Sequence, residues 1–335
     1  MPTRDIVVIG SSAGGVDALQ RLCAHLPADF PAALFVAQHL SPSARSVLPL
    51  LLDRAGPLPA TAAVEGQRIT PGHIYVAPPD RHLLLREGHM LVRRGPYENR
   101  TRPAANALFR SAAIHYGARA IGVVLTGLLD DGTEGLIAIK AAGGVSIVQD
   151  PADAEWPSMP RNALERDHVD HAVPLDAMAA LLTRLAAQDA GPSVALSAAY
   201  LLEDSIAAHE FGTMDAEIVA PGAPSHIGCP DCGGVLNLIE VEDAVRFRCQ
   251  IGHAFTPDGL SAAQNDELER ALGVAVRTHR DRLRLFRQMG DTARARGLAH
   301  AQQRWDVAFE DATDLIALLE TAITNLRGNV PEPGA

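Results

Sequence analysis

The stretch IVVIGSSAGG at residues 6–15 decides how the rest of the chain is interpreted. Its first four residues are all β-branched and predict a strand that is buried on both faces, as in a parallel sheet. The glycines that follow allow a sharp turn, and residues 16–22 predict the next helix. A turn between a strand and a helix N-terminus places small polar side chains beside free backbone N–H groups.

Two kinds of site fit this turn. One is a phosphate cradle, as in dinucleotide-binding folds, and the other is a serine nucleophile beside an oxyanion hole. The spacing departs from G-x-G-x-x-G because Ser12 stands in place of the second glycine. The next predicted strand, residues 33–37, is followed by His39 and offers no acidic residue for a ribose. These departures favour serine chemistry, and nucleotide binding stays open as an alternative.

Composition and charge set the class of protein. The chain has 335 residues, 47% of them hydrophobic but only 4% aromatic, which suits an aliphatic α/β core with appended elements. A formal charge of −11 argues against a nucleic-acid-binding surface. Residues 1–5 lead straight into the first strand and leave no room for a signal peptide, and no apolar run is long enough for a membrane span. We therefore expect a cytoplasmic protein without membrane insertion.

Strand and helix patterns alternate along residues 1–187 and predict a doubly wound, mostly parallel sheet with helices on both faces. The predicted strands cover residues 6–9, 33–37, 120–126 and 145–149, and the predicted helices cover residues 16–22, 43–55, 104–116, 134–142 and 176–187. Residues 56–98 contain short strand-like pieces between turn signals, which indicate an antiparallel excursion. The basic residues 93–102 are expected to form a solvated loop, and residues 156–160 a second loop.

Three of the predicted strands run into Ser12, His39 and Asp131. Ligands of open α/β sheets gather at the carboxyl ends of the strands, so these three side chains are expected to lie together. A hydroxyl, a base and a carboxylate that orients the base are the residue set of a serine hydrolase. Each residue alone also has a structural explanation, as a turn serine, a surface histidine and a helix N-cap.

Six motifs carry a resemblance to a known family. They are I-G-S-S-A-G-G, A-Q-H-L, A-P-P-D-R-H-L, T-R-P-A-A-N-A-L-F-R-S-A-A, V-L-T-G-L-L-D-D-G and S-M-P-R-N-A, in consistent order over residues 4–187. This stretch resembles the catalytic domain of the CheB-type chemotaxis protein-glutamate methylesterases. The resemblance implies hydrolysis of glutamate methyl esters on a methylated receptor or other signalling protein, with Ser12, His39 and Asp131 as the catalytic set. It also implies glutamine deamidation as a second reaction of the same acyl chemistry.

Further site residues follow from the same mechanism. The backbone N–H groups of Ala13 or Leu128 are candidates for stabilising the oxyanion. Arg102 and Met159 are candidates for lining the substrate cleft, and a purely structural role fits both equally well. Leu128 departs from the family, which usually has methionine there. We expect a receiver-less esterase, because the receiver domain that normally precedes this module is missing from the sequence, and a non-catalytic signalling module with the same fold is the alternative from another class.

The late cysteines predict a metal site. Cys229 and Cys232 form a C-x-x-C pair, and Cys249 and His253 follow on the far side of a predicted hairpin with strands at residues 235–241 and 245–248 and a turn at 242–244. Three thiolates and an imidazole suit a structural, tetrahedral zinc ion, whereas a C-x-x-C pair alone would also fit a redox pair. A short module of this size needs such a staple.

The remaining sequence completes the predicted domain organisation. Residues 1–187 form the methylesterase-like domain, residues 188–228 a partly helical linker, residues 229–260 a zinc-ribbon-like module and residues 261–328 a helical hairpin. Apolar residues with 3–4 spacing predict the two helices of the hairpin, with a break near residues 290–297. Packing within the chain and docking, either to a second copy or to a partner, both remain open for these helices.

Overall fold

The computed structural model describes residues 2–43, 46–166, 168–209, 222–241 and 244–328 of the chain. The chain divides into two compact units, of which the first ends at Leu260 and the second begins at Ser261. Along the described part of the chain, no helix combines the length and the apolar character needed to cross a membrane.

A parallel sheet forms the centre of the first unit. Its strands, among the described residues, are β1 Ile6–Ser11, β2 Ala33–Gln38, β3 Ala60–Ala62, β4 Ile74–Val76, β7 Ala120–Val124, β8 Val145–Gln149 and β9 His171–Val173. They lie in the order β3-β4-β2-β1-β7-β8-β9, and every neighbouring pair is parallel. The predicted doubly wound sheet is therefore confirmed, and its order reverses between β1 and β7.

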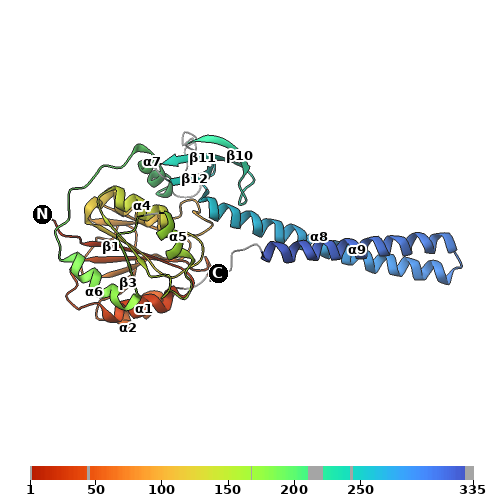
Figure 1. Ribbon diagram of the computed structural model, residues 1–335, viewed down its shortest axis with the longest axis horizontal. Helices are drawn as coiled ribbons and strands as arrows, with labels where there is room; N and C mark the ends of the chain where they lie inside the picture. Colours follow the sequence, from red (N-terminus) through yellow and green to blue (C-terminus); the bar gives the residue numbers. More distant parts are fainter. Residues whose placement is uncertain (1, 44–45, 167, 210–221, 242–243, 329–335) are drawn as a thin grey trace. The chain divides into compact units, whose positions relative to one another are not determined.

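Helices cover both faces of this sheet because its strands are apolar on both sides. The helices are α1 Gly15–His25, α2 Leu48–Ala55, α3 Ala105–Tyr116, α4 Thr133–Ala141, α5 Ser158–Arg166, α6 Leu175–Ala186 and α7 Ala198–Ala207, with a 3₁₀ turn at Gly117–Arg119. Figure 1 shows α1, α2 and α6 on one face and α4 and α5 on the other. Along β1, Val7 packs with Leu19 and Leu182 of the first group, whereas Val8 packs with Phe109 and Leu136 on the opposite face.

Two antiparallel sheets complete the first unit. β5 His82–Arg86 and β6 His89–Arg93 form a hairpin beside α3. β10 Ala223–Gly228, β11 Val235–Val241, β12 Ala244–Cys249 and β13 Ala254–Phe255 form an antiparallel sheet in that order. Residues 222–260, as far as they are described, are called the Cys/His region below.

The second unit is a helical hairpin, as the apolar spacing predicts. α8 Pro257–Ala295 continues into it from the first unit, and α9 Ala299–Gly328 follows. The six predicted apolar positions of α9, which are Phe309, Ala312, Ile316, Leu319, Ile323 and Leu326, are all buried or half-buried. Among the corresponding positions of α8, Leu268 is exposed. The break lies at residues 296–298, later than the predicted start at Gly290, which is helical.

The structure corrects several local predictions. Residues 74–76 join the main sheet as a parallel strand, so the antiparallel excursion is limited to the β5–β6 hairpin. The helix expected at residues 43–55 begins only at Leu48. Ser158 already starts α5, although residues 156–160 were expected to form a loop, because a proline is compatible with the first turn of a helix.

Two further corrections concern supposed loops. The segment of residues 93–102, which is basic and was expected to be solvated, contains the buried side chains of Glu98 and Arg102. Residues 223–228, expected to belong to the linker, form the edge strand β10. Residues 210–221 of that linker lie outside the described residues, and so do residues 242–243 of the hairpin turn.

Candidate active site at the switch point of the sheet

The candidate site lies at the carboxyl ends of β1, β2 and β7. The strand order reverses between β1 and β7, which is where open α/β sheets leave a crevice for ligands. Ser12 directly follows β1, and its backbone N–H donates to the carbonyl of Thr126 beyond β7 at 3.1 Å. His39 directly follows β2, and its N–H donates to the carbonyl of Ser11 at 3.1 Å. The parallel register therefore brings the predicted serine and histidine to adjacent strand ends.

The two serines of the glycine-rich turn differ in their surroundings. Ser11 is fully buried, and its hydroxyl donates to Oε1 of Gln38 at 2.7 Å. Ser12 is half-buried at the turn. A Cβ atom on Gly15 would meet Cβ of Ser11 at 2.8 Å, so this close approach requires glycine. The engaged hydroxyl of Ser11 leaves Ser12 as the serine of this turn that is available to a substrate.

Gln38 ties the two strand ends together. Its Nε2 donates to the carbonyl of Ser12 at 2.8 Å and to the carbonyl of His39 at 3.1 Å. Its side chain is almost fully buried, so these bonds lie in a water-poor environment. Sequence reasoning missed this residue, although a lone polar side chain at the end of an apolar strand was the available signal.

His39 and Asp131 are in direct contact, although 92 residues separate them in the chain. Nε2 of His39 lies 2.7 Å from Oδ2 of Asp131. The side chain of Asp131 is 2% exposed and that of His39 is 16% exposed. A buried carboxylate at this distance fixes the Nε2–H tautomer, which leaves Nδ1 with the lone pair that can accept a proton.

Asp131 is held by the first turn of α3. Its Oδ2 accepts the backbone N–H of Ala105 at 2.6 Å, and its Oδ1 accepts that of Asn106 at 3.0 Å. These two hydrogen bonds orient both oxygens of the carboxylate. Asn106 also accepts, through Oδ1, the backbone N–H groups of Gly132 at 3.0 Å and Gly135 at 2.9 Å. The same asparagine therefore caps α4 and fixes the turn that carries Asp131, a role the sequence did not reveal.

The oxyanion candidates lie in the two turns beside Ser12. The N–H groups of Ser12 and Gly127 are engaged with the carbonyls of Thr126 and Trp156. Ala13 and Leu128, whose N–H groups were predicted as donors, follow β1 and β7 at the same edge. A Cβ atom on Gly127 would meet Cβ of Ser12 at 2.8 Å, so only glycine allows the two turns to approach this closely.

The other two candidate residues are less accessible. Met159 is fully buried, and its backbone N–H donates to the carbonyl of Gly127 at 2.9 Å. Arg102 is 5% exposed; its Nε donates to Oδ1 of Asp80 at 3.0 Å, and its guanidinium lies 4.1 Å from the ring centre of Tyr97. Met159 therefore supports the Gly127 turn, and Arg102 fastens the segment that leads into α3.

The predicted metal-binding residues lie together in the Cys/His region. The ligand atoms of Cys229, Cys232, Cys249 and His253 are all within 4.8 Å of one another. Sγ of Cys229 is 3.7 Å from Nδ1 of His253, and Sγ of Cys232 is 3.7 Å from Sγ of Cys249. A tetrahedral zinc site with metal–sulfur bonds of about 2.3 Å has edges of about 3.8 Å, so this donor set fits the ion.

The first unit is similar to known proteins. A model of the CheB methylesterase family matches residues 7–182, more than half of the 335 residues. The protein-glutamate methylesterase/protein-glutamine glutaminase 2 of Xanthomonas oryzae pv. oryzae (strain MAFF 311018) is 40% identical over 190 residues, which are 56% of this chain and 53% of that relative. The protein-glutamate methylesterase/protein-glutamine glutaminase 5 of Anaeromyxobacter dehalogenans (strain 2CP-C) is 39% identical over 187 residues, which are 55% of this chain and 51% of that relative. The chain thus spans about half the length of the curated relatives it matches.

A solved structure shows the same fold. The crystal structure of the Thermotoga maritima CheB methylesterase catalytic domain aligns with a TM-score of 0.52 at 34% identity, covering 54% of this chain and 98% of that chain. The fold class and the family resemblance predicted from the sequence are both confirmed.

Proposed function

Because the chain belongs to the CheB methylesterase family, we propose that it is a serine-dependent hydrolase of glutamate methyl esters on receptor or other signalling proteins. The observation that carries this proposal is the buried His39–Asp131 hydrogen bond of 2.7 Å next to the strand end that presents Ser12. The relatives' names supply the reaction class, since they are called protein-glutamate methylesterases and protein-glutamine glutaminases.

The proposed reaction is an acyl transfer in two steps. Nδ1 of His39 takes the proton from the hydroxyl of Ser12, whose oxygen attacks the γ-ester carbonyl. Asp131 stabilises the imidazolium, and the N–H groups of Ala13 and Leu128 face the developing oxyanion. The proton passes to the leaving oxygen and methanol departs. A water molecule then attacks the acyl-serine with His39 as base, which releases the glutamate and restores Ser12.

Glutamine deamidation uses the same steps. A glutamine side chain presents an amide in place of the ester, and ammonia leaves in place of methanol. The joint naming of the relatives supports this second reaction. Leu128, which is 42% exposed beside the Ser12 turn, is the residue whose side chain would contact either leaving group.

The test is methanol release from a methylated receptor fragment by the wild type and by Ser12→Ala. We expect release by the wild type alone, because the Ser11 hydroxyl is already engaged with Gln38 and cannot substitute for Ser12. Ser11→Ala, which removes that buried bond but keeps the nucleophile, is the matched control. Equal release by wild type and Ser12→Ala would reject the nucleophile, and a fluorophosphonate probe that labels neither protein would favour the non-catalytic signalling module.

We also propose that Cys229, Cys232, Cys249 and His253 hold a structural zinc ion. Four protein ligands complete a tetrahedron and leave no position for a substrate, so the ion would stabilise the Cys/His region rather than take part in the reaction. Metal analysis should find about one zinc per chain, and less in Cys249→Ser. An unchanged zinc content in that variant would contradict the ligand set. Cysteines that bind metal rather than form disulfides are typical of reducing compartments, which supports action in the cytoplasm.

We propose that the helical hairpin of the second unit mediates association of the protein with a second copy. We propose that residues 1–187 form the catalytic domain, the Cys/His region the zinc module and residues 261–328 the helical hairpin, with α7 in the linker between the first two. Apolar side chains are exposed on both helices of the second unit, namely Leu268, Val274 and Leu285 on α8 and Val307, Leu315 and Leu318 on α9. Pairing with a second copy would bury these side chains in a four-helix bundle.

A further inference from the structure

Asp131 lies in the turn between β7 and α4, and both sides of this turn are in contact with the Cys/His region. On one side, Oδ1 of Asp130 accepts the hydroxyl of Thr256 at 2.9 Å. On the other side, Oε2 of Glu134 lies 2.7 Å from Nε of Arg246. The proposed catalytic residue Asp131 thus lies between Asp130 and Glu134, and both of these contact the Cys/His region.

Thr256 is built into this contact. It is 1% exposed, and Asp130 is fully buried. The backbone N–H of Thr256 donates to Oδ1 of Asn99 at 2.9 Å, and its hydroxyl oxygen accepts the N–H of Gly259 at 3.0 Å. These bonds hold the hydroxyl in place; its nearest acceptor is Oδ1 of Asp130 at 2.9 Å, and Oδ1 of Asn99 lies farther away at 3.4 Å. The second oxygen of Asp130 lies 3.3 Å from the guanidinium of Arg166.

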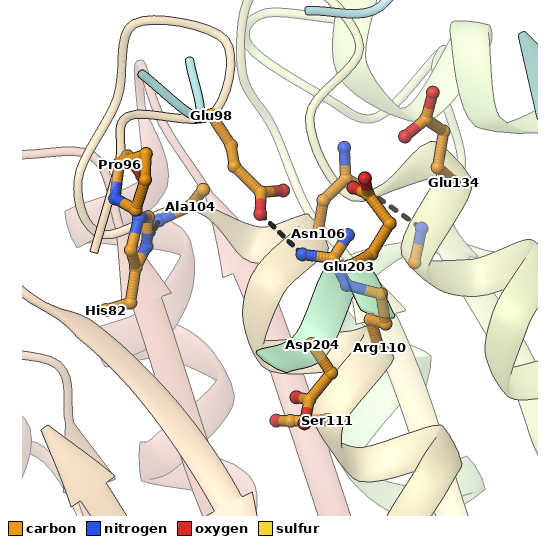
Figure 2. A network of polar contacts seen from close by, with 12 residues as sticks. His82, Pro96, Glu98, Ala104, Asn106, Arg110, Ser111, Glu134, Glu203 and Asp204 are labelled. Carbon is orange, nitrogen blue, oxygen red and sulfur yellow. Dashed lines mark hydrogen bonds and ion pairs between the residues drawn. The ribbon is translucent and has the colours of Figure 1, made fainter. Parts of the chain in front are cut away.

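Arg246 anchors the other side through a buried ionic cluster. Its guanidinium lies 2.8 Å from Glu203 and 3.2 Å from Glu98, in addition to Glu134. Figure 2 shows Glu98 and Glu203 beside Arg110 of α3, with Asn106 one turn away. Burial alone would raise the pKa of Glu98, but the guanidinium groups of the cluster outweigh it and hold this pKa well below its usual range.

Removing part of a buried ionic cluster costs stability whatever the enzyme does, so the cluster alone says little about catalysis. The Thr256 contact is more local, because a single hydroxyl donates to Asp130 and accepts the N–H of Gly259 in the first turn of α8. Asp130 and Asp131 are adjacent, and their carboxylates are held by different elements, the first by Thr256 and the second by the N-terminus of α3. The peptide between them is therefore clamped from both sides.

We propose that Thr256 is a positioning residue for the active site: its hydroxyl holds Asp130 so that Asp131 keeps its hydrogen bond to His39. The Cys/His region is then a structural part of the active site and not only an appended module. This inference rests on the proposed esterase function for its consequence in catalysis. The effect of Thr256 on the His39–Asp131 hydrogen bond does not depend on the proposed function.

The experiment compares Thr256→Val, which keeps the shape but loses the hydroxyl, with Thr256→Ser, which keeps the hydroxyl. Thr278→Val is the control, since Thr278 is an exposed residue of the second unit whose hydroxyl donates to a helix carbonyl. Two quantities are measured on the full chain: the low-field NMR signal of the proton between His39 and Asp131, and the rate at which a fluorophosphonate probe labels Ser12, with Ser12→Ala as the blank.

We expect Thr256→Val to weaken or shift the His39 proton signal and to slow labelling by roughly 10- to 100-fold, the loss expected from a misplaced catalytic group. Thr256→Ser and Thr278→Val should match the wild type in both. In ester hydrolysis the loss should fall on kcat with KM unchanged. A His39 signal in Thr256→Val identical to the wild type overturns the inference, and so does a Thr256→Ser variant as impaired as Thr256→Val. A wild type that shows the signal but is not labelled rejects the proposed function alone.

Discussion

Single residues in this site are set apart by the hydrogen bonds that they already make. Ser11 and Ser12 are chemically identical neighbours, yet the hydroxyl of Ser11 is buried against Gln38, whereas Ser12 is accessible. Asp130 and Asp131 form a second such pair. Asp131 accepts two backbone N–H groups of a helix N-terminus, while Asp130 is buried with a hydroxyl and a more distant guanidinium. Location within the fold therefore gives each member of a pair a different role.

The ionisation of Asp130 yields a prediction about stability. Burial is the main cause that raises the pKa of Asp130 from 3.8 to about 6; Thr256 and Arg166 oppose this rise, whereas Asp258 and Asp131 add to it. Below about pH 4 the carboxyl is protonated in both the folded and the unfolded chain. As the pH rises, the unfolded chain loses this proton first, so the contribution of Asp130 to stability falls between about pH 4 and pH 6.

Asp130→Asn removes this titration while it keeps an oxygen acceptor for Thr256. Relative to the wild type, we expect its free energy of unfolding to increase by about 2–3 kcal/mol between pH 4 and pH 7, from the shift of about two pKa units. Denaturant unfolding of both proteins at the two pH values measures this difference, in which other titrating groups cancel. A difference that does not change with pH would show that Asp130 ionises normally in the folded chain.

Elements explain why part of this architecture could be predicted from sequence. Local apolar runs predict the strand that precedes Ser12 and the strand that precedes His39, and the cysteine spacing predicts the metal site. Asn106 carries no such signal. It caps α4 from within α3, and its bonding partners lie 26 and 29 residues away in sequence. Local patterns report periodicity and turn chemistry, whereas contacts between elements depend on the finished packing.

Local sequence patterns also fail to predict the burial of charged residues in the Cys/His region. Arg246 and Arg248 alternate with apolar residues in a short strand, and both arginine side chains are almost fully buried among carboxylates. Their partner Glu98 comes from a segment that was expected to be solvent-exposed. Charge alternation in a short strand does not reveal that another layer of the protein covers it. The burial of the two arginine side chains follows from the packing of the Cys/His region and not from the sequence of the strand.

Asn106→Ala tests the connection between α3 and α4. The change leaves the buried N–H groups of Gly132 and Gly135 without their acceptor, at a cost of about 1–3 kcal/mol for each. We expect a lower free energy of unfolding and slower labelling of Ser12, because the turn that holds Asp131 loses its cap. Asn325→Ala, at an exposed position of α9, is the matched control. Unchanged stability in Asn106→Ala would mean that other groups or water replace the amide.

At the scale of the whole molecule, different interactions stabilise the interior of each of the two units. The first unit has a closed core on both faces of its sheet. The second unit consists of two helices, and few of its described side chains are buried, among them Val276, Phe286, Ala312 and Ile316. Two ion pairs, Arg280–Glu320 and Arg327–Glu269, join α8 to α9. These pairs are exposed, so they contribute little stability, and apolar packing must supply the rest.

We propose that a second copy of the chain pairs with this hairpin. Helices of this length that expose apolar residues on their outer faces are stabilised when two hairpins combine into a four-helix bundle. The two cross-helix ion pairs hold four charged side chains within one hairpin, so these four do not oppose the approach of a second hairpin. The symmetric contact is also the commonest form of self-association.

We therefore expect the full chain to be dimeric and Leu318→Glu, which places a charge at a side chain that is 64% exposed, to be monomeric. A chain that ends at Gly273 should also be monomeric and should keep both its zinc and the labelling rate of Ser12, because Thr256 and all four metal ligands precede that point. Light scattering at several protein concentrations measures the mass. Glu310→Gln, at an exposed polar position of α9, is the control and should stay dimeric. If the full chain is monomeric at every concentration, the exposed apolar residues serve a different partner; if the shortened chain loses Ser12 labelling, the active site depends on the hairpin itself.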